Sequence, residues 1–378
     1  MKKSLIALAA LGAFASSAMA QSSVTLYGIV DLGIVKQSRA DSLTERSLGG
    51  VGVDHKELHV AQATKSRIGF RGVEDLGGGL SAKFALEHRF TPDTGAINTS
   101  GDNQFWDQSI VGLTSQSFGE ITLGRDYGPT FYSQYLLDPW LNQGVAEVGG
   151  TTYAFAGYSL GGAEARYNNG IFYKMAANGF TVMLSSSLSE EEDVDNRYGA
   201  AVNYSAGPLF VTVAYDQAPS NVNADETNSL LIIGASYDFG MIKPRISFAQ
   251  SNLQTPFGGE AKPTSFTLAA TAPLGNGLLK MGYTQIDWDT PNPYLQAGIG
   301  GALAAEAAKP APNLAVLGAL STQATALMAG DNLKQQKFSL GYEYTLSKRT
   351  AVYADITSGK TKDSDTVNAV DFGIRHAF

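Results

Sequence analysis

Apolar and polar residues alternate along most of this chain, with an apolar side chain at every second position. The segment 337–346 shows this most clearly, and its apolar positions are Phe338, Leu340, Tyr342, Tyr344 and Leu346. The last ten residues repeat the pattern, with one face made of Val370, Phe372, Ile374, His376 and Phe378. Because successive side chains of a β-strand point to opposite faces, each segment is predicted to be a strand with one apolar face.

The same alternation predicts strands of about ten residues along the rest of the chain. The predicted strands, about 16 in all, cover 24–35, 65–73, 80–90, 105–114, 119–125, 165–174, 179–188, 197–205, 208–217, 228–238, 241–251, 263–272, 277–287, 337–346, 348–358 and 369–378. Seven short connections alternate with eight long ones. Most of the short connections contain the Gly, Asn or Pro that tight turns need.

Alternating turns and long loops are typical of an even-stranded outer-membrane barrel, with the turns on the periplasmic side and the loops outside. In hydrocarbon only a closed barrel satisfies every backbone group of the strands. A ring of about 16 strands is too wide for side chains to fill, so its lumen is wet and takes the polar face. We therefore predict an all-β fold, a transmembrane antiparallel β-barrel with its apolar face in lipid. The alternative is an exported soluble β-sandwich, which would not need this alternation of connection lengths.

The first 20 residues have the three parts of a cleaved signal peptide. Lys2 and Lys3 form a positive segment, residues 5–15 are apolar, and residues 18–20 read Ala-Met-Ala. An anchoring helix is the alternative, but the apolar stretch is short for one. We predict a signal peptide over 1–20 and a barrel domain over 21–378.

Composition excludes several classes of protein. The chain has no cysteine, which excludes disulfides, thiolate metal sites and cysteine nucleophiles. Its formal net charge of −8 argues against a nucleic-acid partner. A mean hydropathy of −0.07 is too polar for a bundle of membrane-spanning helices.

Seven segments of the exported chain carry a family resemblance. They read SVTLYGIVD at 23–31, SRIGFRGVEDLG at 66–77, VGL at 111–113, FGEITLGR at 118–125, RYNN at 166–169, LGYEYTLSKRT at 340–350 and GIRHAF at 373–378. Together they resemble the trimeric general porins of beta-proteobacterial outer membranes. The resemblance implies a homotrimer of 16-stranded barrels in the outer membrane of a Gram-negative bacterium, in contact with lipid and lipopolysaccharide. The small residue Gly28, on the outward face of the first strand, is the one local feature that supports close contact between neighbouring barrels.

The resemblance also implies a biogenesis signal and a narrowed pore. The barrel assembly machinery of such proteins reads the terminal aromatic residue and its alternating partners, here Phe378, His376, Ile374 and Phe372. His376 departs from the Tyr or Phe more often found at that position. The third extracellular loop of the family folds into the pore and narrows it.

The residues themselves mark the third long loop as unusual, because it mixes aromatics with acids after Arg125 and is too long for a plain hairpin. A constriction loop is the functional interpretation, and a merely external loop is the alternative. Its acids Asp126 and Asp138 are candidates for one side of the constriction.

A basic wall is predicted to face that loop. If Ile68, Phe70, Phe84 and Leu86 point outward, alternation directs four cations into the lumen, namely Arg67, Arg71, Lys83 and Arg89. Cations opposed by loop acids would create a transverse field that sets ion preference. Alternatively, some of these arginines pair with lumen acids such as Asp31, Glu87 and Asp371.

Three other features are read as solvated loops. His55 and His59 flank Glu57 without the H-E-x-x-H spacing of a zinc site. The acidic run at 190–195 lacks the spacing of a calcium-binding EF-hand loop. The Ala-rich stretch at 297–330 is interrupted by prolines and polar residues, which favours an external loop with a short helix.

We therefore expect a passive, water-filled diffusion channel for small hydrophilic solutes and ions, without enzymatic activity, cofactor or metal, and with a weak preference for anions. A substrate-selective channel is one alternative, which a ladder of aromatic side chains along the lumen would favour. An outer-membrane barrel hydrolase is the other, but the four histidines provide no evident catalytic pair.

Overall fold

The computed structural model describes residues 23–38, 58–97, 105–149, 165–189, 196–220, 226–254, 260–290, 303, 305–309, 313–328, 332–362 and 366–378. The predicted signal peptide at 1–20, His55 and the acidic run at 190–195 lie outside the described residues.

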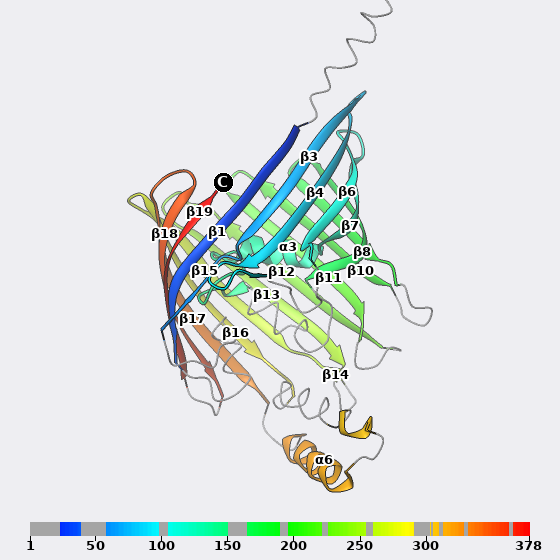
Figure 1. Cartoon of the computed structure of the whole chain (residues 1–378), viewed down its shortest axis with the longest axis vertical. Helices are drawn as coiled ribbons and strands as arrows, with labels where there is room; N and C mark the ends of the chain where they lie inside the picture. Colours follow the sequence, from blue (N-terminus) through cyan, green and yellow to red (C-terminus); the bar gives the residue numbers. More distant parts are fainter. Residues whose placement is uncertain are drawn as a thin grey trace, which may run out of the picture.

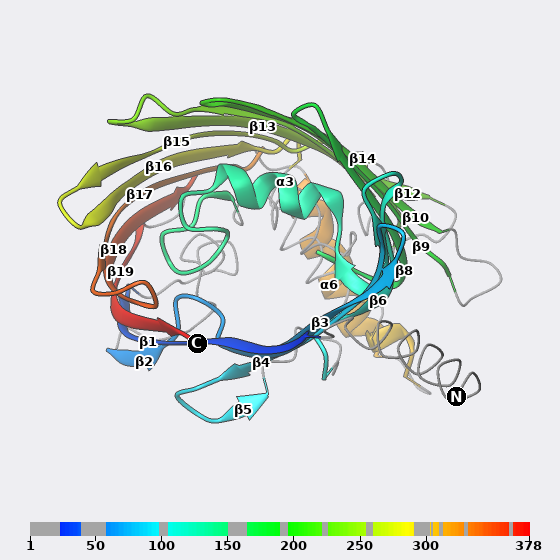
Figure 2. The same cartoon turned by 90° about the horizontal axis from the view of Figure 1, so that it is seen from above.

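Sixteen long strands form one antiparallel sheet that closes on itself (Figures 1 and 2). They are β1 (Ser23–Gln37), β3 (Arg67–Gly77), β4 (Leu80–Thr91), β6 (Gln108–Ser115), β7 (Gly119–Tyr127), β8 (Arg166–Ala177), β9 (Phe180–Ser187), β10 (Arg197–Ala206), β11 (Leu209–Pro219), β12 (Thr227–Tyr237), β13 (Lys243–Gln254), β15 (Thr264–Leu274), β16 (Gly277–Asp287), β17 (Lys334–Thr345), β18 (Thr350–Thr361) and β19 (Thr366–Ala377). Three short segments extend the sheet, namely β2 (His59–Ala61), β5 (Ala96–Ile97) and β14 (Glu260–Ala261). The ring is closed because β1 pairs with β3 on one side and β19 on the other.

The strand prediction is confirmed, since each of the sixteen predicted segments coincides with one long strand to within a few residues. The seven short connections lie together at one end of the barrel, which we call the turn end, and the strand ends that flank the long connections lie at the other, which we call the loop end. Helix α6 (Leu314–Met328) occupies the Ala-rich connection, as predicted, and lies beyond the loop end in Figure 1. No helix among the described residues combines the length and apolarity needed to cross a membrane.

The two faces of the wall differ in polarity as predicted. On β17 the side chain of Phe338 is 55% exposed on the outside, whereas its neighbour Lys337 is 0% exposed on the inside. On β19 Phe372 and Ile374 are outward and exposed, and Asp371 is buried within. The exterior is therefore a continuous apolar band, which suits a lipid environment.

Gly28 and Phe378 form the seam at which the ring closes. Their backbone N–H groups each donate to the other residue's carbonyl at 3.1 Å. A Cβ atom on Gly28 would meet the Phe378 ring and would lie 2.6 Å from the carbonyl oxygen of Arg67. The space beside Gly28 is thus filled by this chain's own Phe378, so Gly28 offers no room for a neighbouring barrel.

Residues 128–149, the described part of the connection between β7 and β8, enter the barrel, as Figure 2 shows. Helix α3 (Pro129–Leu137) begins this segment, with Pro129 in the first turn, where its missing N–H costs no helical hydrogen bond. Leu137 packs in an apolar cluster with Ile232 and Ala249 of the wall. On the same side of the helix, the Thr212 hydroxyl donates either to Ser133 at 3.0 Å or to Asn203 at 2.6 Å. One face of α3 is therefore fixed to strands β10 to β13.

Residues 138–149 continue the loop and anchor it a second time. The Asp138 carboxylate accepts backbone N–H bonds from Trp140 at 3.0 Å, Asn142 at 2.9 Å and Gly149 at 3.1 Å, which folds the segment back on itself. Trp140 then donates its indole N–H to Asp355 of β18 at 2.8 Å.

Two further contacts hold this segment against the wall. Val145, Ala146 and Val148 are fully buried in a cluster that includes Val35 of β1 and Ala369 of β19. Lys337 is also fully buried and lies 3.8 Å from the Glu147 carboxylate. The loop thus covers much of the inner wall from β10 round to β19 and the end of β1, and it leaves a passage lined mainly by β1, β3, β4 and β6 to β9.

We predict that Gly28→Ala weakens the seam. The added methyl group meets backbone as well as the Phe378 ring, and overpacking of this kind costs about 1–3 kcal/mol. Urea unfolding of the folded protein in detergent, followed by heat-modifiable mobility on gels, measures the loss. Gly318→Ala is the matched control, because nothing lies within 4 Å of its added atom. Equal unfolding midpoints for the two variants would contradict the assignment.

We also predict that Trp140→Phe loosens the constriction loop. The variant leaves the buried Asp355 carboxylate without its indole donor, a loss of about 1–3 kcal/mol. Single-channel recordings should then show more open-channel noise and more frequent partial closures. Trp106→Phe is the control, because Trp106 contacts Phe105 and His88 instead of the loop. Recordings as quiet as those of the unmodified protein would show that this bond does not hold the loop.

Candidate functional site

Two cavities occupy the open side of the lumen and meet at the level of α3. The outer cavity, of about 550 Å³, lies toward the loop end, and the inner cavity, of about 840 Å³, lies toward the turn end. Four side chains line both, namely Gln108, Tyr127, Tyr132 and Tyr135. These four residues therefore lie at the boundary between the two cavities, which we call the constriction.

The outer cavity is strongly basic. Its charged lining residues, among those that the structure describes, are Lys65, Arg67, Arg89, Arg125 and Arg166 together with one acid, Glu87. A surplus of cations around a confined space creates a positive potential there.

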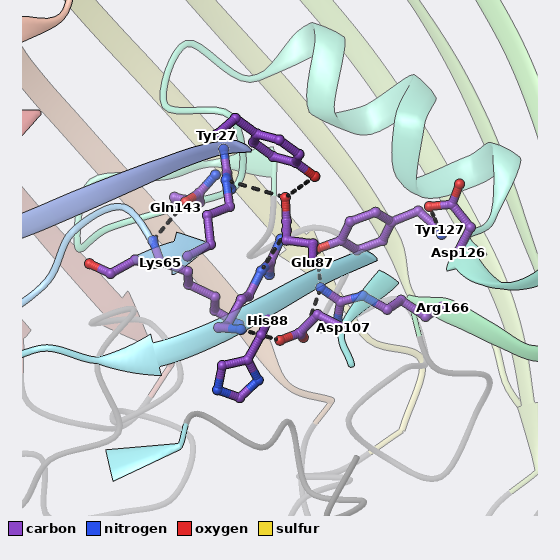
Figure 3. Close-up of polar contacts among 12 residues, drawn as sticks. Tyr27, Lys65, Glu87, His88, Asp107, Asp126, Tyr127, Gln143 and Arg166 are labelled. Atoms are coloured by element: carbon purple, nitrogen blue, oxygen red, sulfur yellow. Dashed lines mark hydrogen bonds and ion pairs between the residues drawn. The ribbon is translucent and has the colours of Figure 1, made fainter. Parts of the chain in front are cut away.

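Glu87 lies between two of these arginines. Its Oε2 atom is 3.5 Å from Nε of Arg67, and its Oε1 atom is 3.4 Å from Nε of Arg89. The Tyr27 hydroxyl donates to Oε2 at 3.4 Å. Arg67 and Arg89 are direct partners in the β3–β4 register. One carboxylate thus holds two guanidinium groups in place while neutralising one charge. Figure 3 shows Glu87 facing Tyr27, with His88 of the same strand pointing away.

Tyr127 is held rigidly at the end of β7. Arg166 donates to its hydroxyl at 2.6 Å and lies over its ring at 4.2 Å, and the Phe131 ring stacks on it at 3.9 Å. Arg166 is fixed in turn by Asp107 at 3.1 Å, with only 6% and 4% of the two side chains exposed. Figure 3 shows Asp107, Arg166 and Tyr127 in one connected group. This group sets the position of the constriction on its β7–β8 side.

The inner cavity has mixed charges. Lys83 pairs with Glu120 at 2.8 Å, and the Arg71 guanidinium lies over the Tyr27 ring at 5.1 Å. Asp126 and Lys174 also line this cavity. The four predicted cations are therefore divided, with Arg67 and Arg89 on the outer cavity and Arg71 and Lys83 on the inner one.

The two predicted loop acids occupy different environments. Asp126 lines the inner cavity and accepts a hydrogen bond from the Tyr132 hydroxyl at 3.1 Å. Asp138 is 1% exposed and enclosed by its own loop. Burial and the neighbouring Glu147 carboxylate raise the pKa of Asp138 to about 6. The structure thus brings Asp126, but not Asp138, to the passage.

The lumen face of α3 is aromatic where acids had been expected. Tyr132 and Tyr135 line both cavities, Phe131 lines the outer one, and Leu136 lines the inner one and is 46% exposed. Burial and the Asp126 carboxylate raise the pKa of Tyr132 well above its usual value, so its phenol stays neutral. The sequence shows that this segment contains aromatic residues, but reading it as a loop does not predict that they share one face. The four positions 131, 132, 135 and 136 have the spacing of one helical face, which is the signal that could have shown it.

Arg125 was missed for a different reason. The register of β7 with β8 shifts between Gly124 and Asp126, and Gly124 has a φ of 125°. At such a bulge the inward–outward alternation breaks, so that Arg125 and Asp126 both line cavities. Alternation from Leu123 would have directed Arg125 outward.

Of the acids considered as partners for the arginines, Glu87 is the one that contacts the basic wall among the described residues. Asp31 instead accepts bonds from the Tyr353 hydroxyl at 2.7 Å and the backbone of Ala63 at 3.1 Å. Asp371 lies opposite Asp355 in the β18–β19 register, away from the cavities. The described part of the chain contains no group of three His, Asp or Glu side chains placed to hold a metal ion.

The proposed assembly residues lie on the outside of the last strand. Phe372 is 60% exposed and Ile374 is 49% exposed. The His376 ring nitrogen Nδ1 is 2.9 Å from the Thr350 hydroxyl, and Phe378 covers Gly28.

Known proteins resemble the chain over its full length. The model of the family described as Gram-negative porin matches residues 7–364. The chain is 33% identical to outer membrane porin protein 32 of Delftia acidovorans over 405 residues and 33% identical to an outer membrane porin protein of Bordetella pertussis over 421 residues, with 100% of each chain covered. Among solved structures, the anion-selective porin from Comamonas acidovorans has a TM-score of 0.72 at 28% identity and covers 95% of this chain and 100% of its own. The chain therefore belongs to the Gram-negative porin family.

Proposed function

We propose that this porin is a passive, water-filled diffusion channel of the outer membrane for small hydrophilic solutes and ions, with a preference for anions. The observation that carries the proposal is the outer cavity, where five cations and a single acid line the approach to the constriction. The family to which the chain belongs consists of channels rather than enzymes, so the solute passes down its own gradient without chemical change.

Local charge outweighs total charge in this proposal. The chain has a formal net charge of −8, but charges that are exposed to salt water are screened beyond about 8–10 Å. Cations on a narrow passage with low-dielectric walls act at short range on every ion that crosses. The likeness to a solved porin whose title names it anion-selective supports the same sign of preference.

The size limit comes from α3 and its loop in this proposal. The helix is fixed to β10–β13 by Leu137 and Ser133, and the following segment is fixed to β18 by Trp140. A constriction held at several points keeps one diameter, which suits a filter that sorts solutes by size. Arg67, Arg71, Lys83 and Arg89 supply the charge on the facing wall, and Asp126 is the predicted acid that lines the inner cavity.

We further propose that residues 1–20 act as a signal peptide that directs export and is cleaved after Ala20, and that the chain assembles as a homotrimer. The support for both is the family membership together with the signal-like composition of residues 1–20. Export would bring the chain to the barrel assembly machinery, with Phe378 in the recognised position, and insertion would bring its apolar exterior into contact with lipid and lipopolysaccharide.

We predict that the double variant Arg67→Gln/Arg71→Gln reduces anion preference. At about 4 Å in water one unit charge contributes about 1 kcal/mol, a factor of about five, so loss of two charges should lower the anion-to-cation permeability ratio at least fivefold. Reversal potentials across planar bilayers under a chloride salt gradient measure the ratio. Lys348→Gln/Arg349→Gln is the matched control, because it also removes two cations, at an exposed turn outside both cavities. Cation preference in both the unmodified protein and the double variant would overturn the proposal.

We predict that the folded protein runs as a trimer in mild detergent. Unheated samples should give a band near three times the monomer mass, and heating should convert it into a single monomer band. Single-channel steps should then appear and close in groups of three. A monodisperse monomer by light scattering in the same detergent, with single conductance steps, would count against the trimer.

A further inference from the structure

The constriction has two chemically different walls. One wall, on β3, β4 and β8, presents Arg67, Arg89 and Arg166 to the outer cavity. The other, on α3, presents Phe131, Tyr132 and Tyr135 to the same cavity. Figure 2 shows α3 across the lumen from β3 and β4. A solute that enters therefore meets guanidinium groups on one side and aromatic rings on the other.

The aromatic wall is preorganised. The rings of Tyr127 and Phe131 are stacked at 3.9 Å with an angle of 7° between their planes, and Tyr135 continues the row, with its centroid 6.2 Å from that of Phe131. Because Arg166 holds the far face of Tyr127, this row keeps its orientation when the cavity is empty. The outer cavity, of about 550 Å³, falls within the 300–1,000 Å³ range of small-molecule sites, so it admits a ring-sized solute.

We propose that the outer cavity is a binding subsite for aromatic carboxylates, anions in which a carboxylate is attached to a flat apolar ring. The carboxylate is attracted by Arg67, whose side chain is 20% exposed, and by the buried Arg89 beside it, because the single charge of Glu87 neutralises only one of these two guanidinium charges. The ring lies against Phe131 and Tyr135. This inference rests on the proposed function and names the solute class that the same passage prefers.

Other classes of solute interact favourably with only one of the two walls. Chloride or acetate is attracted by the cations but gains nothing from the rings. A neutral phenol contacts the rings but leaves the guanidinium groups without a counter-charge, and an aromatic cation is repelled by five positive side chains. Stacking contacts are modest in strength, so a bound ring leaves again and permeation continues.

Block of the chloride current by benzoate tests the proposal. Benzoate, acetate, phenol and benzylammonium are each added to a planar bilayer that contains the full-length folded channel in chloride salt. Benzoate should reduce the mean current at a concentration about fivefold lower than acetate, which is the factor expected for one ring contact. Phenol and benzylammonium should be weaker than benzoate. Equal block by benzoate and acetate, or equal block by benzoate and phenol, would overturn the subsite.

Two variants locate the effect. Tyr135→Leu keeps an apolar side chain but removes the ring, so the ratio of acetate to benzoate blocking concentrations should fall toward one. Tyr344→Leu is the matched control on the outer face of β17, where Tyr344 is 37% exposed, and it should keep the full ratio. An unchanged ratio in Tyr135→Leu would overturn the assignment to α3.

The chloride reversal potential separates this inference from the proposed function. If the unmodified channel prefers chloride but treats benzoate as it treats acetate, the subsite is wrong and the anion channel stands. If it prefers cations, the proposed function itself is wrong, and with it the subsite.

Discussion

Closure of the backbone hydrogen-bond network is the constraint on which the whole molecule depends. Hydrocarbon offers no partner to an unpaired N–H or C=O group, so a sheet in a bilayer needs a last strand that returns to its first. Here β19 returns to β1, and the reciprocal bonds between Gly28 and Phe378 complete the ring. The absence of a side chain at Gly28 lets the terminal ring lie flat over the seam. A closed ring of this width then requires a wet interior, and a wet interior is what makes a charged passage possible.

The interior is polar but mostly not open. Many inward side chains of β10 to β19 are covered by the loop after β7, and even Lys337 is fully buried beside Glu147. The loop therefore divides the lumen into a packed half and a passage. Burial of charged groups beneath the loop, such as Asp355 under the Trp140 indole, makes its displacement costly because each would lose its partner. The contacts that hold the loop against the wall therefore stabilise the loop and also keep it inside the lumen, where it narrows the passage.

The sequence predicted the fold almost completely and the site in part. Alternation gave the sixteen strands and the side to which Arg67 or Lys83 turns, because period two is a local property of an extended chain. It failed at Arg125, where a bulge at Gly124 interrupts the period. It also failed at Asp138, because the fate of a loop carboxylate depends on which backbone N–H groups the loop brings round to it. Such long-range folding leaves no periodic trace in the chain.

The constriction loop uses one set of side chains to anchor itself and a different set to contact a passing solute. Leu137, Asp138 and Trp140 face the wall or the loop's own backbone, while Tyr135 and Leu136 face the passage. Exchange of Tyr135 or Leu136 leaves these anchoring contacts intact, so the chemistry of the passage can change without loss of the loop's fold. The barrel and the anchored part of the loop thus form a fixed frame, and a few side chains of α3 determine which solutes that frame admits.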